Sequence, residues 1–267
     1  MFLTVITFED AFAAVSNPDS HHAQFTSYGM FFDPQTMIVV RSGGRAWAAI
    51  GGNYALAEWP DSDWKPQFII HGSANVAYEY DDHAGGTLYT QTVDARVGFS
   101  YDVNLSSDFR AALIWTHQSG HIADNVPNKE LIGPDLGNEV LDLRFIKDYD
   151  GHWRVGGGFR PYAFTNPNMI AFGAEQFAEW YPLGSSETVD KFVPFAAVGF
   201  EEYGIRSVEW TAHFEMGLVA ADHMRARGHQ SLRYVVGAYS GWDPRLKYYQ
   251  FKAMKDHFVY GGIVFEM

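Results

Sequence analysis

Hydrophobic and polar residues alternate with a period of two along most of this chain. The clearest run spans residues 92–103, where every second residue is hydrophobic, and a second run spans residues 207–218. Successive side chains of a β-strand point to opposite faces, so this alternation predicts strands with one apolar and one polar face. No helical repeat and no linker interrupts the pattern, which predicts a single all-β domain.

The alternating segments have the length and spacing of a barrel. We count eleven of them, each about ten residues long, a length that suits a tilted membrane strand. They are 46–59, 67–80, 92–103, 109–116, 138–149, 153–163, 169–180, 192–201, 207–218, 231–241 and 257–267, with a twelfth in 34–42. The sequence therefore predicts an antiparallel β-barrel of about 12 strands over residues 34–267, preceded by a non-barrel N-terminal segment, 1–33.

The composition of the two faces indicates which one meets water. The polar faces carry charges of both signs, such as Asp94 with Arg96, and few lysines. A membrane barrel turns its polar face inward and places aromatic girdles at both interfaces. Candidate girdle residues near strand ends are Trp47, Trp59, Tyr80, Tyr101, Trp115, Trp153, Trp180 and Tyr234. We therefore predict a transmembrane barrel, with a soluble lipocalin-like barrel or a sandwich as the alternative.

Overall composition excludes several classes of function. None of the 267 residues is a cysteine, so disulfides, thiolate metal sites and thiol catalysis are excluded. A net charge of −13 argues against a nucleic-acid partner, whose phosphates would be repelled. No stretch approaches about 18 consecutive apolar residues, which excludes a membrane-spanning helix. We expect no metal and no cofactor.

The last eight residues, YGGIVFEM, resemble the terminal signal of bacterial outer-membrane barrels, with Met267 where phenylalanine is usual. Four further stretches are SNPDS at 16–20, HQSGHIAD at 117–124, EVLDL at 139–143 and VGGG at 155–158. Together they resemble a bacterial outer-membrane β-barrel family of unknown function. The resemblance covers most of the chain and implies location in a Gram-negative outer membrane, but no reaction.

The run from His117 to His121 is the best candidate for chemistry. By strand phase, His117 and Ser119 continue an apolar face just beyond Trp115 and therefore face lipid near the interface. The pair resembles the arrangement in outer-membrane lipid A deacylases, in which a serine attacks an acyl ester and a histidine is its base. Glu139, on the next strand, is the candidate carboxylate that orients the histidine.

The same run has a purely structural interpretation. Polar residues that cap a strand at the interface can bind lipid phosphate or a neighbouring subunit, and we assign this role to His121, Asp124 and Trp115. Inward-facing charged residues are candidates to line or fill the lumen. They are Arg96, Asp142, Arg144, Arg154, Arg160, Glu175, Glu209 and Glu215. Because the lumen of about twelve strands is modest, we expect salt-bridged side chains to fill it.

Three functions remain open at this point. We favour an integral outer-membrane barrel that contacts or organises lipid without catalysis, either alone or as a homo-oligomer. The alternatives are a lipid esterase or deacylase that uses Ser119, His117 and Glu139, and a small-solute channel. The expected partners are phospholipid or lipopolysaccharide and further copies of this chain.

Overall fold

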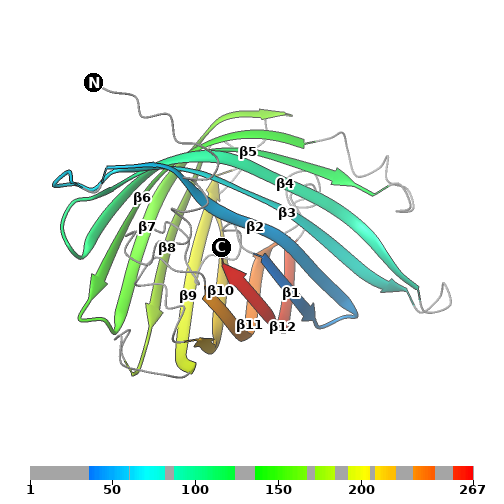
Figure 1. Cartoon of the computed structure of the whole chain (residues 1–267). Helices are drawn as coiled ribbons and strands as arrows, with labels where there is room; N and C mark the ends of the chain where they lie inside the picture. Colours follow the sequence, from blue (N-terminus) through cyan, green and yellow to red (C-terminus); the bar gives the residue numbers. More distant parts are fainter. Residues whose placement is uncertain are drawn as a thin grey trace.

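The strands close into one antiparallel barrel (Figure 1). The computed structural model describes residues 36–59, 61–81, 87–123, 136–166, 172–183, 192–204, 208–220, 231–243 and 255–266. The strands are β1 (Thr36–Arg41), β2 (Arg45–Glu58), β3 (Gln67–Asp81), β4 (Thr87–Asn104), β5 (Phe109–Ile122), β6 (Leu136–Tyr149), β7 (Trp153–Asn166), β8 (Phe172–Trp180), β9 (Phe192–Gly204), β10 (Val208–Ala220), β11 (Ser231–Trp242) and β12 (Lys255–Glu266). Each pairs with its neighbours in sequence, and β1 pairs with β12. The predicted fold class is confirmed.

The barrel closes where its first and last strands meet. Strand β1 contributes six residues to this seam, from Thr36 opposite Phe265 to Arg41 opposite Tyr260. A Cβ atom on Gly262 would lie 2.2 Å from the backbone oxygen of Ile38, so only glycine permits this approach. Closure leaves no unpaired strand edge between β1 and β12, which a membrane-spanning sheet requires.

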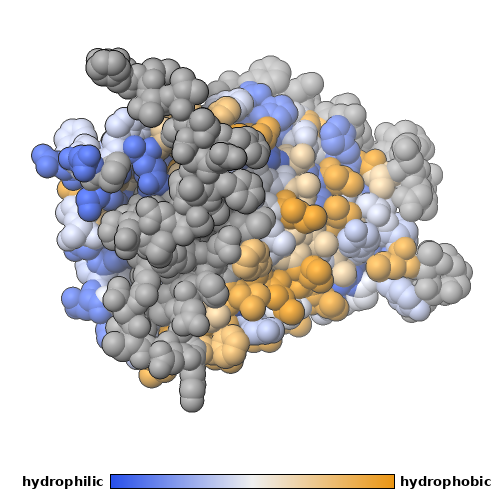
Figure 2. All heavy atoms as spheres, viewed as in Figure 1, coloured by the Kyte–Doolittle hydropathy of each residue, from blue (hydrophilic) through white to orange (hydrophobic). Residues whose placement is uncertain are grey.

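The exterior of the barrel is apolar and the interior is polar. On β4, Val97, Phe99 and Tyr101 are exposed, whereas Asp94 and Asp102 are buried. Figure 2 shows hydrophobic side chains gathered over the lower and right-hand parts of the surface, and hydrophilic ones at the end where the turn between β2 and β3 lies. This inverted arrangement confirms the predicted transmembrane barrel, because the soluble alternative requires the opposite one.

Two details differ from the sequence prediction. The strands range from six residues in β1 to 18 residues in β4, and β5 extends to Ile122 so that it includes the whole run from His117. Trp47, expected in an aromatic girdle, is instead buried inside the barrel under the guanidinium of Arg41. The prediction failed because Ala46 and Ala48, not Trp47, hold the outward positions of β2.

In the part of the chain that the structure describes, no helix is long and apolar enough to cross a membrane. The predicted N-terminal segment, 1–33, lies outside the described residues. Its boundary with the barrel therefore stays a prediction.

Candidate functional site

A histidine and a glutamate meet on the outer face of the barrel. His117 on β5 lies directly opposite Glu139 on β6, and the Nδ1 atom of His117 is 2.7 Å from Oε1 of Glu139. Both side chains point outward, with 42 % and 31 % of their surfaces exposed. An ionised carboxylate can only accept, so Nδ1–H is the donor in this bond and Nε2 keeps its lone pair. The pair therefore holds the imidazole in the tautomer of a general base.

Ser119 follows on the same outward face of β5. Alternate residues of a strand are about 6.5–7 Å apart at Cα, within reach of a long side chain such as histidine. Among the residues described, Ser119 donates no hydrogen bond to His117. Catalytic hydrogen bonds are often long or absent before substrate binds, so this geometry is compatible with a nucleophile and its base.

Small residues flank Ser119 on both sides. Ala95 lies opposite it on β4 and Gly137 lies opposite it on β6. A Cβ atom placed on Gly137 would meet no atom of the described residues within 4 Å. In the part of the chain that the structure describes, the side of Ser119 that faces Gly137 is therefore open to a molecule approaching from outside the barrel.

A β-bulge accompanies the carboxylate of this site. The register between β6 and β7 shifts between Glu139, which opposes Phe164, and Val140, which opposes Tyr162. A bulge inserts one extra residue into a strand, and bulges often re-aim side chains beside active sites. Here the extra residue, Ala163, belongs to β7, next to the pair formed by Glu139 and Phe164.

Apolar and aromatic side chains extend from the site toward the middle of the barrel wall. The rings of Phe68, Phe99 and Trp115 stack across β3, β4 and β5, with centroids 5.6 and 5.9 Å apart. Leu113 and Leu141 are exposed beside them. The polar cluster therefore lies at the rim of an apolar surface that suits hydrocarbon chains.

The other predicted contact residues lie beyond this cluster or outside the described chain. His121 is exposed on the same face of β5, opposite Val93 of β4. Asp124 lies outside the described residues. The candidate contacts of both with lipid stay predictions.

Charged side chains fill the interior at the level of β6, β7 and β8. Arg144 and Arg160 both bond to Glu175, and Arg160 is 3.1 Å from Oδ2 of Asp142. Arg144 and Glu175 are among the largest fully buried side chains of the barrel. Two positive and two negative charges are thus balanced in the lumen, as buried charges require.

The remaining predicted lumen residues are more scattered. Arg154 is buried and lies 2.7 Å from Asp148, and Glu215 is buried against Arg233. Arg96 is half-buried. Glu209 belongs to β10, but its side chain lies outside the described part of the structure.

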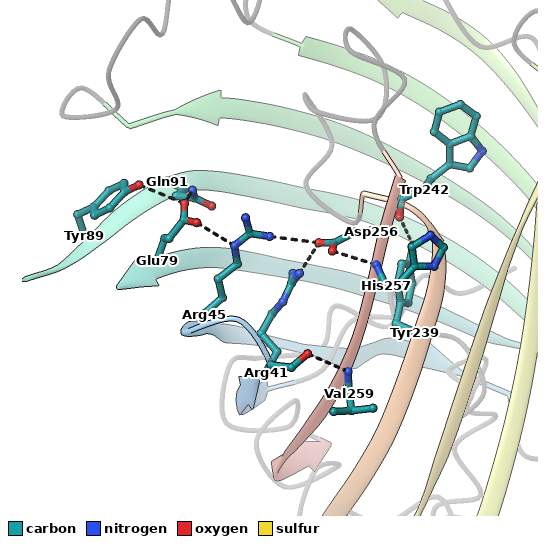
Figure 3. Close-up of polar contacts among 11 residues, drawn as sticks. Arg41, Arg45, Glu79, Tyr89, Gln91, Tyr239, Trp242, Asp256, His257 and Val259 are labelled. Atoms are coloured by element: carbon teal, nitrogen blue, oxygen red, sulfur yellow. Dashed lines mark hydrogen bonds and ion pairs between the residues drawn. The ribbon is translucent and has the colours of Figure 1, made fainter. Parts of the chain in front are cut away.

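A second inward-facing network joins five strands at one end of the barrel (Figure 3). The carboxylate of Asp256 bonds to Arg41 and lies 3.6 Å from Arg45. Arg45 in turn lies 3.0 Å from Glu79, which also accepts from Tyr89 at 3.1 Å. The network bridges the seam between β12 and β1.

The sequence offered no signal for a second serine–histidine pair. Ser240 at the end of β11 lies opposite His257 of β12, and its Oγ atom is 2.8 Å from Nδ1 of that histidine. The two residues are far apart in sequence and match no motif. Only the register of β11 against β12 reveals them.

Comparisons with known proteins support the fold. No protein-family model and no curated protein sequence matches this chain. The solved structure of outer membrane phospholipase A from Escherichia coli matches with a TM-score of 0.56 and 11% identity, over 94% of this chain and 96% of that one. An active-site mutant of that phospholipase gives a TM-score of 0.57 at 11% identity, over 95% and 97%. A KdgM porin gives 0.51 at 11% identity, over 88% and 98%.

At this level of identity the likeness shows a shared fold. Together with the apolar exterior and the closed barrel, it defines the class of protein: a transmembrane β-barrel of the bacterial outer-membrane type. The fold that this chain shares with those outer-membrane barrels supports the predicted outer-membrane location.

Proposed function

We propose that this barrel is a lipid ester hydrolase, with Ser119 as the nucleophile, His117 as the general base and Glu139 as the residue that orients the base. The observation that carries the proposal is the 2.7 Å hydrogen bond between His117 and Glu139 on the lipid-facing surface, beside an accessible serine. Outer membrane phospholipase A, by name a lipid hydrolase, has the same fold. These points favour the esterase alternative over a protein that organises lipid without catalysis.

The geometry supports a two-step acyl transfer. Nε2 of His117 takes the hydroxyl proton of Ser119 as Oγ attacks the ester carbonyl carbon. The tetrahedral intermediate collapses, the C–O bond to the alcohol breaks, and the imidazolium returns the proton to the departing alcohol. Water, deprotonated by His117, then releases the fatty acid from Ser119. Glu139 stabilises the imidazolium that forms in each step.

The position of the site orients its substrate. The acyl chain lies along the apolar surface formed by Trp115, Leu113 and Leu141, and the ester reaches Ser119 through the open space at Gly137. The headgroup then lies toward the end of β5, where the strand leaves the apolar zone. Glycerophospholipids and lipopolysaccharide both present acyl esters at this depth, so both are candidate substrates.

Two substitutions test the assignment of roles. Ser119→Ala is expected to abolish release of fatty acid from lipid vesicles, and Glu139→Gln to lower kcat by about 10²- to 10⁴-fold while the barrel stays folded. Ser106→Ala, a change at an exposed serine in the turn after β4, serves as the matched control and is expected to retain full activity. Hydrolysis that survives Ser119→Ala would exclude this nucleophile.

A third substitution tests the approach of the substrate. Gly137→Leu fills the space beside Ser119 and leaves all three triad residues unsubstituted, so kcat/KM for lipid should fall by about tenfold or more. Gly261→Leu places the same side chain on the outward face of β12 and should leave activity unchanged. Equal activities of the two variants would contradict the proposed substrate path.

The other two predicted functions have distinct signatures. A wild-type protein that releases no fatty acid, yet purifies as a homo-oligomer with bound lipid, would restore the non-enzymatic interpretation. Stable conductance steps in planar bilayers would favour the small-solute channel.

A further inference from the structure

The outer surface carries a second polar site on the strands that close the barrel. Ser240 and His257 point outward from β11 and β12 and share a hydrogen bond of 2.8 Å. Lys255, two residues before His257, is exposed on the same face of β12. The three side chains are therefore grouped on two adjacent strands, in a part of the wall that the proposed hydrolase site does not use.

Lys255 brings a positive charge to this site, and the acidic residue next to it in the sequence faces the other way. Asp256, between Lys255 and His257, turns its carboxylate into the barrel, where Arg41 and Arg45 hold it (Figure 3). The ammonium group of Lys255 lies on the other side, 5.9 Å from the ring centre of Trp242. The alternation of β12 thus separates the ammonium group of Lys255 on the outer face from the carboxylate of Asp256 on the inner face.

The hydrogen bond between Ser240 and His257 leaves one donor directed outward. If the serine hydroxyl donates to Nδ1, the neutral imidazole carries its proton on Nε2; if Nδ1–H donates, the serine hydroxyl is free to donate. In both tautomers the pair presents a hydrogen-bond donor beside an ammonium group. Donors next to a positive charge are the groups that bind phosphate oxygens.

The surroundings place this site at the membrane interface. Val259 is 61 % exposed directly below His257 on β12, and Val236 is 56 % exposed on β11. The site lies at the end of the barrel where β11 leads into β12, which is also the end where β5 leads into β6. It therefore has the depth of a lipid headgroup, with acyl-chain contacts below it.

We propose that Ser240, His257 and Lys255 bind the phosphate group of an outer-membrane lipid. The lipid is either a glycerophospholipid or the phosphorylated lipid A of lipopolysaccharide, and its acyl chains lie over Val259 and Val236. This binding site is independent of the proposed hydrolase, because its residues lie on other strands and it needs no catalysis.

Lipid titrations of the full-length protein, followed by native mass spectrometry, test the site. The probes are phosphatidylglycerol, bisphosphorylated lipid A and diacylglycerol, which has acyl chains but no phosphate. The double variant Lys255→Gln/His257→Gln should bind both phosphorylated lipids about tenfold more weakly, and Ser240→Ala less so, with diacylglycerol binding unchanged. Lys147→Gln, which removes a strand lysine already bonded to Asp108, is the matched control.

The outcomes separate the sources of the phosphate and can overturn the proposal. A larger loss for lipid A assigns the site to lipopolysaccharide, and a larger loss for phosphatidylglycerol assigns it to glycerophospholipid. Unchanged binding of both lipids by a folded double variant overturns the site. Equal affinity of the wild-type protein for phosphatidylglycerol and diacylglycerol also overturns it, without recourse to any variant.

Discussion

Substitution of Arg144 tests whether water reaches the interior of the barrel at the level of β6 to β8. The side chains of Arg144 and Glu175 are 2 % and 1 % exposed, and they are joined by two hydrogen bonds. In Arg144→Met, the carboxylates of Glu175 and Asp142 share Arg160 alone. Removing one partner of a buried pair costs about 3–5 kcal/mol, because the other charge stays buried. The ratio of folded to unfolded protein should therefore fall by about 10²- to 10⁴-fold.

The double variant Arg144→Met/Glu175→Leu provides the control. It leaves Asp142 paired with Arg160 and removes the uncompensated charge, so it should be more stable than Arg144→Met alone by about 2 kcal/mol or more. Urea unfolding in lipid vesicles, followed by tryptophan fluorescence, gives the three free energies.

A cost below about 1 kcal/mol for the single variant would refute this reasoning. Such a value is typical of ion pairs in contact with water. The lumen would then be hydrated at the level of β6 to β8, and the channel alternative would gain support.

Three further predictions concern the seam and one turn. Gly262→Ala should lower the free energy of unfolding by about 1–3 kcal/mol, because its Cβ would lie 2.2 Å from the oxygen of Ile38. In Gly261→Ala the nearest atom would be 3.5 Å from the new Cβ, so its free energy of unfolding should stay within about 0.5 kcal/mol of the wild-type value. Urea unfolding measures both. Asp256→Asn should lower the temperature at which the barrel unfolds, because Arg41, 4 % exposed, loses a charged partner at the seam. Gel electrophoresis of heated samples measures this temperature as the loss of the faster-migrating folded band. The hydrogen bond from Lys147 holds the pKa of Asp108 below its usual value. The bond therefore stabilises the turn at pH values above the pKa that Asp108 has in the unfolded chain, and this stabilisation is lost as the pH falls through the lower pKa of the folded protein. Titration of the Asp108 carboxyl resonance in wild type and Lys147→Gln should show a higher pKa in the variant.

The alternation of residues was sufficient to predict the strands and their two faces. In residues 92–103, side-chain direction follows from backbone geometry alone, so Asp94 and Val97 could be assigned to opposite faces without knowledge of their neighbours. Trp47 shows the limit of this reasoning. Its hydrophobicity favours either face, and only the phase of β2 in the closed barrel turns it inward.

The candidate site was predictable in part for the same reason. His117 and Ser119 share a face because they are two residues apart on one strand. The contact with Glu139 depends on the register of β6 against β5. Spacing in the sequence leaves that register open, because the connecting segment does not determine which residues pair.

The sequence by itself determined an all-β membrane barrel of about twelve strands, its inverted faces, and an outward His-x-Ser pair, because all three depend on local periodicity. The tertiary structure alone decided which residues meet across strands: His117 with Glu139, Ser240 with His257, and Arg144 with Glu175. These contacts depend on hydrogen-bond register and on closure of β1 against β12, which are properties of the whole sheet and leave no local pattern in the chain.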